Sequence, residues 1–354
     1  MSKKIISFPH IGEYSYFAKY YFETISDCTV KLAPPITKKT VELGNKYSPD
    51  FICFPFKYNL GNYIETLENE ANILFQLGGG CRYGNYGTLQ KEILKDLGYN
   101  FKFYNLINLG KLDLNRIYRI FKDLNPNLRK YKFFIESIKV MLKIVLFDKT
   151  EHYRRKKISV KKDGFYELKN ELINKLKDEK SLIKIIKIYF HYMYKYRHQK
   201  TKKPKLKIGI IGELFTSIEP YSTFNLEKIL KQYDVSIKRY TDASFLLIYK
   251  KIFGFFMFKK CKRYLKYKIG ADATYNVYRV IDLNKKGFDG IIHTKPFGCT
   301  PEVGSTPILA KIANDLNIPI MFLSFDTNTS NEGIKTRIEA FIDMLNMRKE
   351  KENE

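Results

Sequence analysis

The feature that most constrains this fold is an alternation of short β-rich runs with helical stretches, which occurs twice along the chain. In the first half we expect strands at 4–9, 29–33, 50–55, 72–77 and 101–106, and helices at 13–25, 38–47, 59–69 and 88–97. Strands separated by helices of about 10 to 15 residues indicate a parallel sheet. Residues 1–110 are therefore predicted to form an N-terminal α/β domain.

A second series of the same kind follows a long helical stretch. Its expected strands are 207–211, 235–239, 289–294 and 318–325, and its last helix is 332–346, with Thr329 and Glu332 as a capping box. The residues between the two series, 113–197, have helical apolar spacing, and 201–205 has the composition of a linker with a boundary at Pro204. We predict an α/β protein of two Rossmann-like domains with parallel sheets, residues 1–110 and 206–354, joined by a mostly helical basic segment, residues 111–205.

Charge is concentrated in that basic segment. The chain carries 63 Lys and Arg against 37 Asp and Glu, a net charge of +26, and residues 111–205 contain 28 cationic and 10 anionic side chains. A bias toward lysine in the coding sequence would explain part of this excess, and an acidic partner would explain it as well. Tyrosines at 189, 192, 194 and 196 lie among the lysines, but they also suit a helix core and no nucleic-acid motif frames them. We therefore expect a solvated helical face or a docking face, and no nucleic-acid ligand.

Nothing in the sequence predicts a membrane-spanning segment. The longest apolar stretch, 244–258, is interrupted by Lys250 and Lys251 and is shorter than the roughly 20 residues that a span needs. We expect it to form a core helix. The N-terminus has Gly12 and Glu13 where a signal peptide needs a continuous apolar run. The expected location is the cytoplasm, where the five cysteines would remain thiols.

Three of the cysteines occupy comparable places. Cys53 closes the apolar run 51–55, Cys81 follows three glycines, and Cys299 follows the run 291–293. Each is expected at or just beyond the carboxyl end of a strand, where open α/β sheets place their sites. Helix N-termini next to Cys81 and Cys299 would stabilise a thiolate, a good metal ligand. Their spacing matches no compact zinc or ferredoxin motif, so buried or incidental structural cysteines are the alternative.

The other candidate groups are weaker. Cys28 and Cys261 lack a glycine loop and a position after a strand, and we expect them to be structural. The glycine-rich loop 78–87 joins a strand to a helix, but it lacks the Lys and Ser or Thr of a P-loop, so we expect no ATP site there. His10 and His293 lie at strand ends, where they could be acid–base groups or hydrogen-bonded structural residues.

Several long motifs resemble the family of 2-hydroxyacyl-CoA dehydratase subunits and their activase-related relatives, which includes the double-cubane cluster proteins. They include FPHIGEY from Phe8, QLGGGCRYGNYG from Gln76, IGIIGELFTSIEP from Ile208 and HTKPFGCTPEVGSTPILAK from His293. The resemblance covers roughly residues 4–110 and 205–345 and is closer to the activase-related branch. No family motif matches the basic segment.

The resemblance implies an iron–sulfur cluster, of the 4Fe–4S or double-cubane type, whose cysteine ligands carry over onto Cys53, Cys81 and Cys299. It also implies an ATP-hydrolysing activator that delivers low-potential electrons, and a related subunit or a second copy as partner. The implied function is a reductive or radical reaction on a small substrate such as an acyl-CoA, which leaves a lyase and a reductase both open. The alternative is a non-catalytic electron-transfer or accessory component of such a system.

Overall fold

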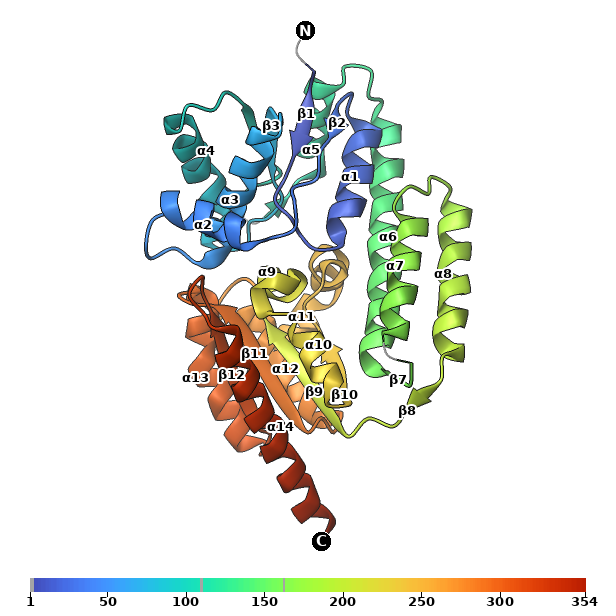
Figure 1. Ribbon diagram of the computed structural model, residues 1–354, viewed down its shortest axis with the longest axis vertical. Coiled ribbons are helices and arrows are strands. Elements are labelled where there is room, and N and C mark those ends of the chain that lie inside the picture. Colours follow the sequence, from blue (N-terminus) through green and yellow to red (C-terminus); the bar gives the residue numbers. More distant parts are fainter. Residues whose placement is uncertain (1–2, 109–110, 162) are drawn as a thin grey trace. The chain divides into compact units, whose positions relative to one another are not determined.

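The computed structural model describes residues 3–108, 111–161 and 163–354 (Figure 1). The chain divides into two compact units, Met1–Ile144 (unit 1) and Val145–Glu354 (unit 2). The boundary falls inside the long helix α6 (Lys130–Lys156). The predicted boundary at residue 110 lies outside the described residues, and the division into three parts stays a prediction.

Unit 1 contains a four-stranded parallel sheet in the order β2-β1-β3-β4. Its strands are β1 (Ile5–Ser7), β2 (Thr29–Val30), β3 (Ile73–Gln76) and β4 (Lys102–Asn105). Its helices are α1 (Tyr14–Ile25), α2 (Lys38–Tyr47), α3 (Phe54–Glu68), α4 (Tyr86–Asp96) and α5 (Leu114–Leu124). Two short strands, β5 (Ile107–Asn108) and β6 (Lys111–Leu112), pair antiparallel. The predicted parallel sheet is confirmed.

Both faces of this sheet are covered, because successive strand residues point to opposite sides. Phe75 of β3 packs with α1, α5 and the first turns of α6, whereas Leu74 packs with α3 and α4. Helices α2 and α3 approach so closely that a Cβ at Gly61 would lie 2.0 Å from the carbonyl oxygen of Thr40. Glycine at this position therefore allows α2 and α3 to pack closely against each other.

The strand expected at 50–55 is wrong. Phe51 is 97% exposed, Cys53 is the N-cap of α3, and Pro55 lies in the first turn of that helix. Proline is favoured there because the first turn needs no N–H donor. The run of Phe and Ile has strand propensity, but the helix start at Pro55 determines the local structure.

Unit 2 contains a second four-stranded parallel sheet, in the order β10-β9-β11-β12. The strands are β9 (Leu206–Gly212), β10 (Val235–Arg239), β11 (Gly290–Pro296) and β12 (Ile320–Phe325). The helices after β9 are α9 (Leu214–Ile218), α10 (Leu226–Gln232), α11 (Lys250–Cys261), α12 (Ala273–Lys285), α13 (Thr300–Asp315) and α14 (Asn331–Asn353). Ile291 packs toward α12 and α13, while Gly290 faces Phe341 and Leu345 of α14.

The basic segment is helical, as predicted. It consists of α5, α6, α7 (Gly164–Leu176) and α8 (Leu182–His198), with a two-residue hairpin of β7 (Ile158–Ser159) and β8 (Thr201–Lys202). The expected linker 201–205 therefore begins with a short strand. Leu172, Leu176 and Met193 are buried, but Ile183 and Phe190 are exposed. Tyr192 and Tyr196 are buried instead and form part of the helical core.

The stretch 244–258 is helical but does not lie in the core. It forms a π-helical turn, Phe245–Tyr249, followed by α11, and four of its large apolar side chains are exposed, namely Ile252, Phe253, Phe255 and Phe256. The expected capping box at Thr329 is also wrong, because Ser330 caps α14 and accepts the N–H of Gly333. Within the described ranges no helix is long and apolar enough to cross a membrane.

Candidate functional site

The two sheets share one strand order, and two of the predicted ligands occupy equivalent loops in them. In each sheet the first strand in sequence lies in the centre, and the second strand pairs with one side of it. The third strand then pairs with the other side of the first strand. The strand order therefore reverses beside β3 in unit 1 and beside β11 in unit 2. Cys81 follows β3 and Cys299 follows β11. Both cysteines lie at a topological switch point, the usual binding position in open α/β sheets.

Cys53 also lies near the Cys81 loop of unit 1, but it follows no strand. Its Sγ lies 2.6 Å from the hydroxyl oxygen of Tyr86. Tyr86 is the first residue of α4, the helix that follows the Cys81 loop. The edge-to-face contact of Phe56 with Tyr86, with ring centroids 5.1 Å apart, holds α3 against α4. Packing of α3 on α4 thus brings Cys53 to the loop that carries Cys81.

The Cys81 loop is tied down by polar side chains. Gln76, at the end of β3, donates from Nε2 to the carbonyl oxygens of Gly78 and Tyr83, at 3.0 and 2.6 Å. Asn59 of α3 donates to the Tyr83 hydroxyl at 2.6 Å. Cys81 itself is exposed and caps a 3₁₀ turn (Arg82–Asn85), where its Sγ accepts the N–H of Tyr83 at 3.5 Å. These bonds hold an exposed thiol on an ordered loop.

The pKa of the Tyr86 hydroxyl depends on both thiols of unit 1, Cys53 and Cys81. Burial raises the pKa of the Tyr86 hydroxyl strongly, and the charges of Cys53 and Cys81 raise it further, while Arg82 opposes them. The hydroxyl therefore stays protonated and can donate to Cys53 Sγ when this sulfur is a thiolate. A donated hydrogen bond favours a sulfur that carries negative charge.

Cys299 is buried and is the N-cap of α13, with Pro301 in the first turn. Its carbonyl oxygen accepts the N–H of Val303 at 2.8 Å. Burial lowers the pKa of Lys295, at the end of β11, and the charges of Cys299 and Glu302 act in the opposite direction. A cationic side chain and a helix N-terminus thus both lie beside this sulfur, and both favour a thiolate.

A buried polar cluster supports the first turn of α13. His293 Nε2 lies 2.7 Å from Glu302 Oε2, and both residues are at most 1% exposed. Asn276 of α12 donates to both oxygens of Glu302 and accepts from Arg279, and its Oδ1 also accepts the N–H of Gly212. His293 is therefore a hydrogen-bonded structural residue that connects β11 to α13. These bonds fix the turn that presents Cys299.

Sequence reasoning missed two acids near this cluster. Glu213 follows β9 directly and caps α9, and burial raises its pKa to about 7, an effect that the Asp272 charge increases. Burial also raises the pKa of Asp272, although Arg279 opposes the effect. The position of Glu213 after a strand was a signal in the sequence. Asp272 is the N-cap residue of α12 and Arg279 lies within that helix. Nothing in the local sequence pattern indicates that either side chain is buried.

The remaining cysteines and His10 have structural surroundings. Cys261 is fully buried, its Sγ donates to the carbonyl oxygen of Met257, and burial raises the pKa of its thiol to about 12. Cys28 packs against the first core of unit 1, and burial raises the pKa of its thiol as well. His10 Nδ1 accepts the N–H of Gly12. Neither cysteine lies at a helix N-terminus beside a cation.

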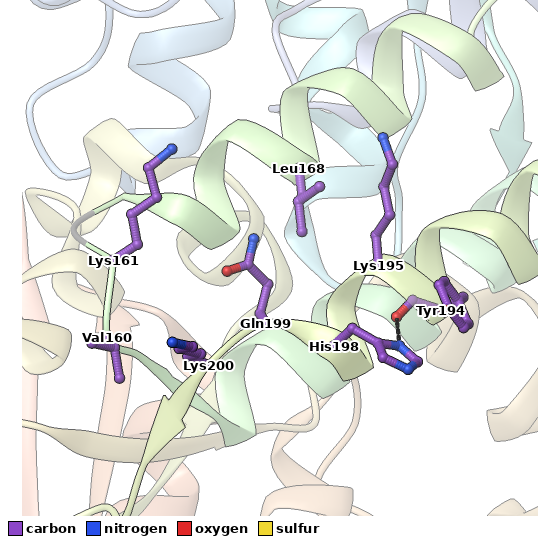
Figure 2. Close-up of a pocket in the computed structure, with 8 residues that line it drawn as sticks. All are labelled: Val160, Lys161, Leu168, Tyr194, Lys195, His198, Gln199 and Lys200. Atoms are coloured by element: carbon purple, nitrogen blue, oxygen red, sulfur yellow. Dashed lines mark hydrogen bonds between the residues drawn. The ribbon is translucent and has the colours of Figure 1, made fainter.

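No three or more His, Cys, Asp or Glu side chains gather into a group able to hold a metal ion among the residues that the structure describes. Cys53 and Cys81 are brought to one loop of unit 1, and Cys299 belongs to unit 2. A cavity of about 540 Å³ lies elsewhere, between β7, α7 and α8 (Figure 2). It is lined by lysines at 161, 195 and 200 and by His198, and by no cysteine.

Comparison with protein-family models gives a match within unit 2. Residues 263–345 match the family model of the 2-hydroxyglutaryl-CoA dehydratase D-component, a range that includes β11, Cys299 and α13. No curated protein matches the chain. The match falls in one of the two regions where the motifs of the sequence resemble this family. Residues 263–345 are thus similar to the 2-hydroxyglutaryl-CoA dehydratase D-component, in agreement with the resemblance of the sequence motifs.

Proposed function

We propose that this protein binds an iron–sulfur cluster through the thiolates of Cys53, Cys81 and Cys299 and accepts low-potential electrons from an ATP-dependent activator. The electrons serve a reductive or radical reaction on a small substrate, and an acyl-CoA is the substrate class that the family suggests. Two ligands come from unit 1 and one from unit 2.

The observation that carries the proposal is the shared setting of the three thiols. Each of the three cysteines caps the start of a helix, and Cys81 and Cys299 follow the third strand of sheets with the same strand order. Cys28 and Cys261 share neither feature. Soft thiolate donors are the ligands that iron–sulfur clusters require. The donor set therefore fits such a cluster.

The protein's own groups would tune this site. The Tyr86 hydroxyl would donate to the Cys53 thiolate, and the N–H of Tyr83 donates to Cys81 Sγ. Arg82 and Lys295 add positive charge near Cys81 and Cys299. When bound, a cluster with three cysteine ligands supplies single low-potential electrons and an iron whose fourth position is open to another ligand. Hydrogen bonds and cations next to the sulfurs favour the electron-rich state.

The activator is expected to supply the ATP site. The loop 78–87 of this chain lacks the Lys and Ser or Thr of a P-loop, and its Gly80 lies in open space. Coupling to ATP hydrolysis would therefore come from a partner protein. The cationic side chains of residues 111–205 offer an acidic partner a surface for docking.

Single-cysteine variants test the ligand assignment. After anaerobic purification, Cys53→Ser, Cys81→Ser and Cys299→Ser are each expected to lose most of the bound iron and acid-labile sulfide. Cys28→Ser and Cys261→Ser serve as matched controls and should keep the content of the parent protein. Equal iron in Cys81→Ser, Cys261→Ser and the parent would refute the assignment.

A further inference from the structure

The outer face of α11 exposes an unusual number of large apolar side chains. Phe255 is 72% exposed, Phe256 is 62%, Ile252 is 57% and Phe253 is 45%. All four lie within two turns of one helix. Single exposed apolar residues are common on protein surfaces, but a contiguous group of this kind marks a binding surface. We call these four residues the α11 patch.

The inner face of the same helix is fixed to unit 2, so the patch cannot turn inward. Gly254 is buried, and a Cβ at this position would lie 2.8 Å from the hydroxyl oxygen of Tyr275. Cys261, at the end of the helix, is fully buried in the core formed by α12, α13 and the sheet. Gly254 and Cys261 share one side of the helix, because seven residues span about two turns. The α11 patch covers the opposite side.

The chain around the patch is strongly and uniformly cationic. Between Ala243 and Ala271 there is no Asp or Glu, and there are eight cationic residues: Lys250, Lys251, Lys259, Lys260, Lys262, Arg263, Lys266 and Lys268. Outside this stretch and outside residues 111–205, cationic and anionic side chains are equal in number. A general bias toward lysine would raise the charge everywhere, so the cations at α11 are a local feature.

The exposed apolar side chains and the surrounding cations together indicate which kind of partner the α11 patch binds. A second copy of the chain would bring the same eight cations against themselves in a twofold contact, and like charges repel. A protein interface of stable kind is depleted in lysine relative to the rest of the surface. Phenylalanines next to lysines are instead typical of helices that lie in the headgroup region of an anionic bilayer, where apolar burial and charge attraction act together. We propose that the α11 patch and its flanking lysines bind a membrane surface that carries anionic lipids.

The proposal is tested by sedimenting the full-length protein with lipid vesicles. We expect binding to vesicles of phosphatidylglycerol and phosphatidylcholine in equal amounts that is at least about tenfold tighter than binding to pure phosphatidylcholine. Raising the salt from 0.1 M to 0.5 M should weaken the binding, because the screening length falls below ~10 Å. The double variant Phe255→Ser/Phe256→Ser should weaken it at least about tenfold by removing the apolar anchor.

A matched control lies on α8, which is also rich in lysine. Its Ile183 is 68% exposed and its Phe190 is 65% exposed, so Ile183→Ser/Phe190→Ser removes comparable apolar surface from another basic helix. This variant should bind vesicles like the parent. Absence of binding to anionic vesicles, or equal binding by the α11 variant and the parent, would overturn the proposal. So would a dimer in sedimentation velocity that dissociates in the α11 variant, since the patch would then belong to a second copy.

Discussion

The hydroxyl oxygen of Tyr86 lies 2.6 Å from Sγ of Cys53, one of the proposed ligands. Tyr86→Phe removes this hydroxyl, which would donate to a Cys53 thiolate, and keeps the ring that packs on Phe56. Hydrogen bonds to cluster sulfurs stabilise the reduced state, so the reduction potential should become more negative by about 20 to 60 mV. A redox titration followed by paramagnetic resonance measures the shift.

Tyr83→Phe is the control for this titration, because the Tyr83 hydroxyl accepts from Asn59 and the backbone N–H toward Cys81 remains. Its potential should stay close to that of the parent. A potential unchanged in Tyr86→Phe would show that the Cys53 sulfur does not belong to the redox centre.

Glu302 is predicted to be essential for stability. Glu302→Ala leaves the buried His293 and Asn276 without their shared acceptor, which should lower the free energy of unfolding by about 3 kcal/mol. Glu332→Ala, at an exposed position of α14, should change it by less than about 0.5 kcal/mol. Urea unfolding followed by circular dichroism compares the two. Similar losses in both variants would contradict the structural role of the cluster.

The positions of some site residues could be predicted from the sequence, and those of others could not. Cys81 and Cys299 could be assigned to loops after strands, because glycines and Pro301 mark the strand ends and helix starts. Cys53 was assigned to the wrong element, and its approach to Tyr86 depends on the packing of α3 against α4. Hydrogen bonds such as Asn276 to Glu302 join residues 26 positions apart, and no local pattern encodes them.

Helices α6 and α10 and strand β10 are joined by buried ion pairs. Glu227 of α10 accepts from Arg154 and Arg155 of α6 and from Arg239 of β10, at 2.8 to 2.9 Å. Glu227→Gln removes the charge that these guanidinium groups share and should cost about 3 to 5 kcal/mol. Glu92→Gln, in an exposed pair with Lys95, should cost less than about 1 kcal/mol. Equal unfolding free energies in both variants would contradict this account.

The same ion pairs predict a loss of stability in acid. Burial alone would raise the pKa of Glu151, but Arg154, Lys169 and Arg155 lower it to about 2, and the pKa of Glu227 is lowered too. A carboxyl whose pKa is depressed in the folded state stabilises the protein above its unfolded pKa of 4.5. The unfolding free energy should therefore fall as the pH drops from about 5 to 2, and fall less steeply in Glu227→Gln. A profile that is flat over this range in the parent would be inconsistent with these pairs.

Elements were predicted well where apolar spacing and turn residues agreed. The expected helix 38–47 and strand 235–239 coincide with α2 and β10. The run 50–55 failed because apolar residues next to a proline also suit a helix start. For the stretch 244–258 the predicted helix is correct, but the predicted burial in the core is wrong. Apolar composition predicts burial only when nothing else, such as a lipid surface, covers the helix.

The common strand order of the two sheets could not be found in the sequence. The sequence shows no repeat at a fixed period. The strand order of a sheet depends on how the helical connections cross over it, and many different sequences are compatible with one order. Only the structure reveals that Cys81 and Cys299 occupy equivalent loops of the two units. That equivalence is the main support for reading them as ligands of one kind.

The cations of residues 111–205 predict how the activator associates. If docking is electrostatic, the affinity should fall as salt rises, because the screening length shrinks from ~10 Å at 0.1 M to ~3 Å at 1 M. Lys195 and Lys200 line the cavity of Figure 2 and are natural positions for charge reversal. Binding titrations with the activator at several salt concentrations measure the effect. Association that does not depend on salt, or tighter binding to nucleic acid, would contradict a docking role.

The most direct test of the central claim is the iron and acid-labile sulfide content of the full chain after anaerobic purification, together with its paramagnetic resonance spectrum in the reduced state. The account predicts iron and sulfide in nearly equal amounts, at least four of each per cluster, and a spectrum typical of a reduced iron–sulfur cluster. A protein that folds and carries neither iron nor sulfide, before and after reconstitution with both, would contradict it.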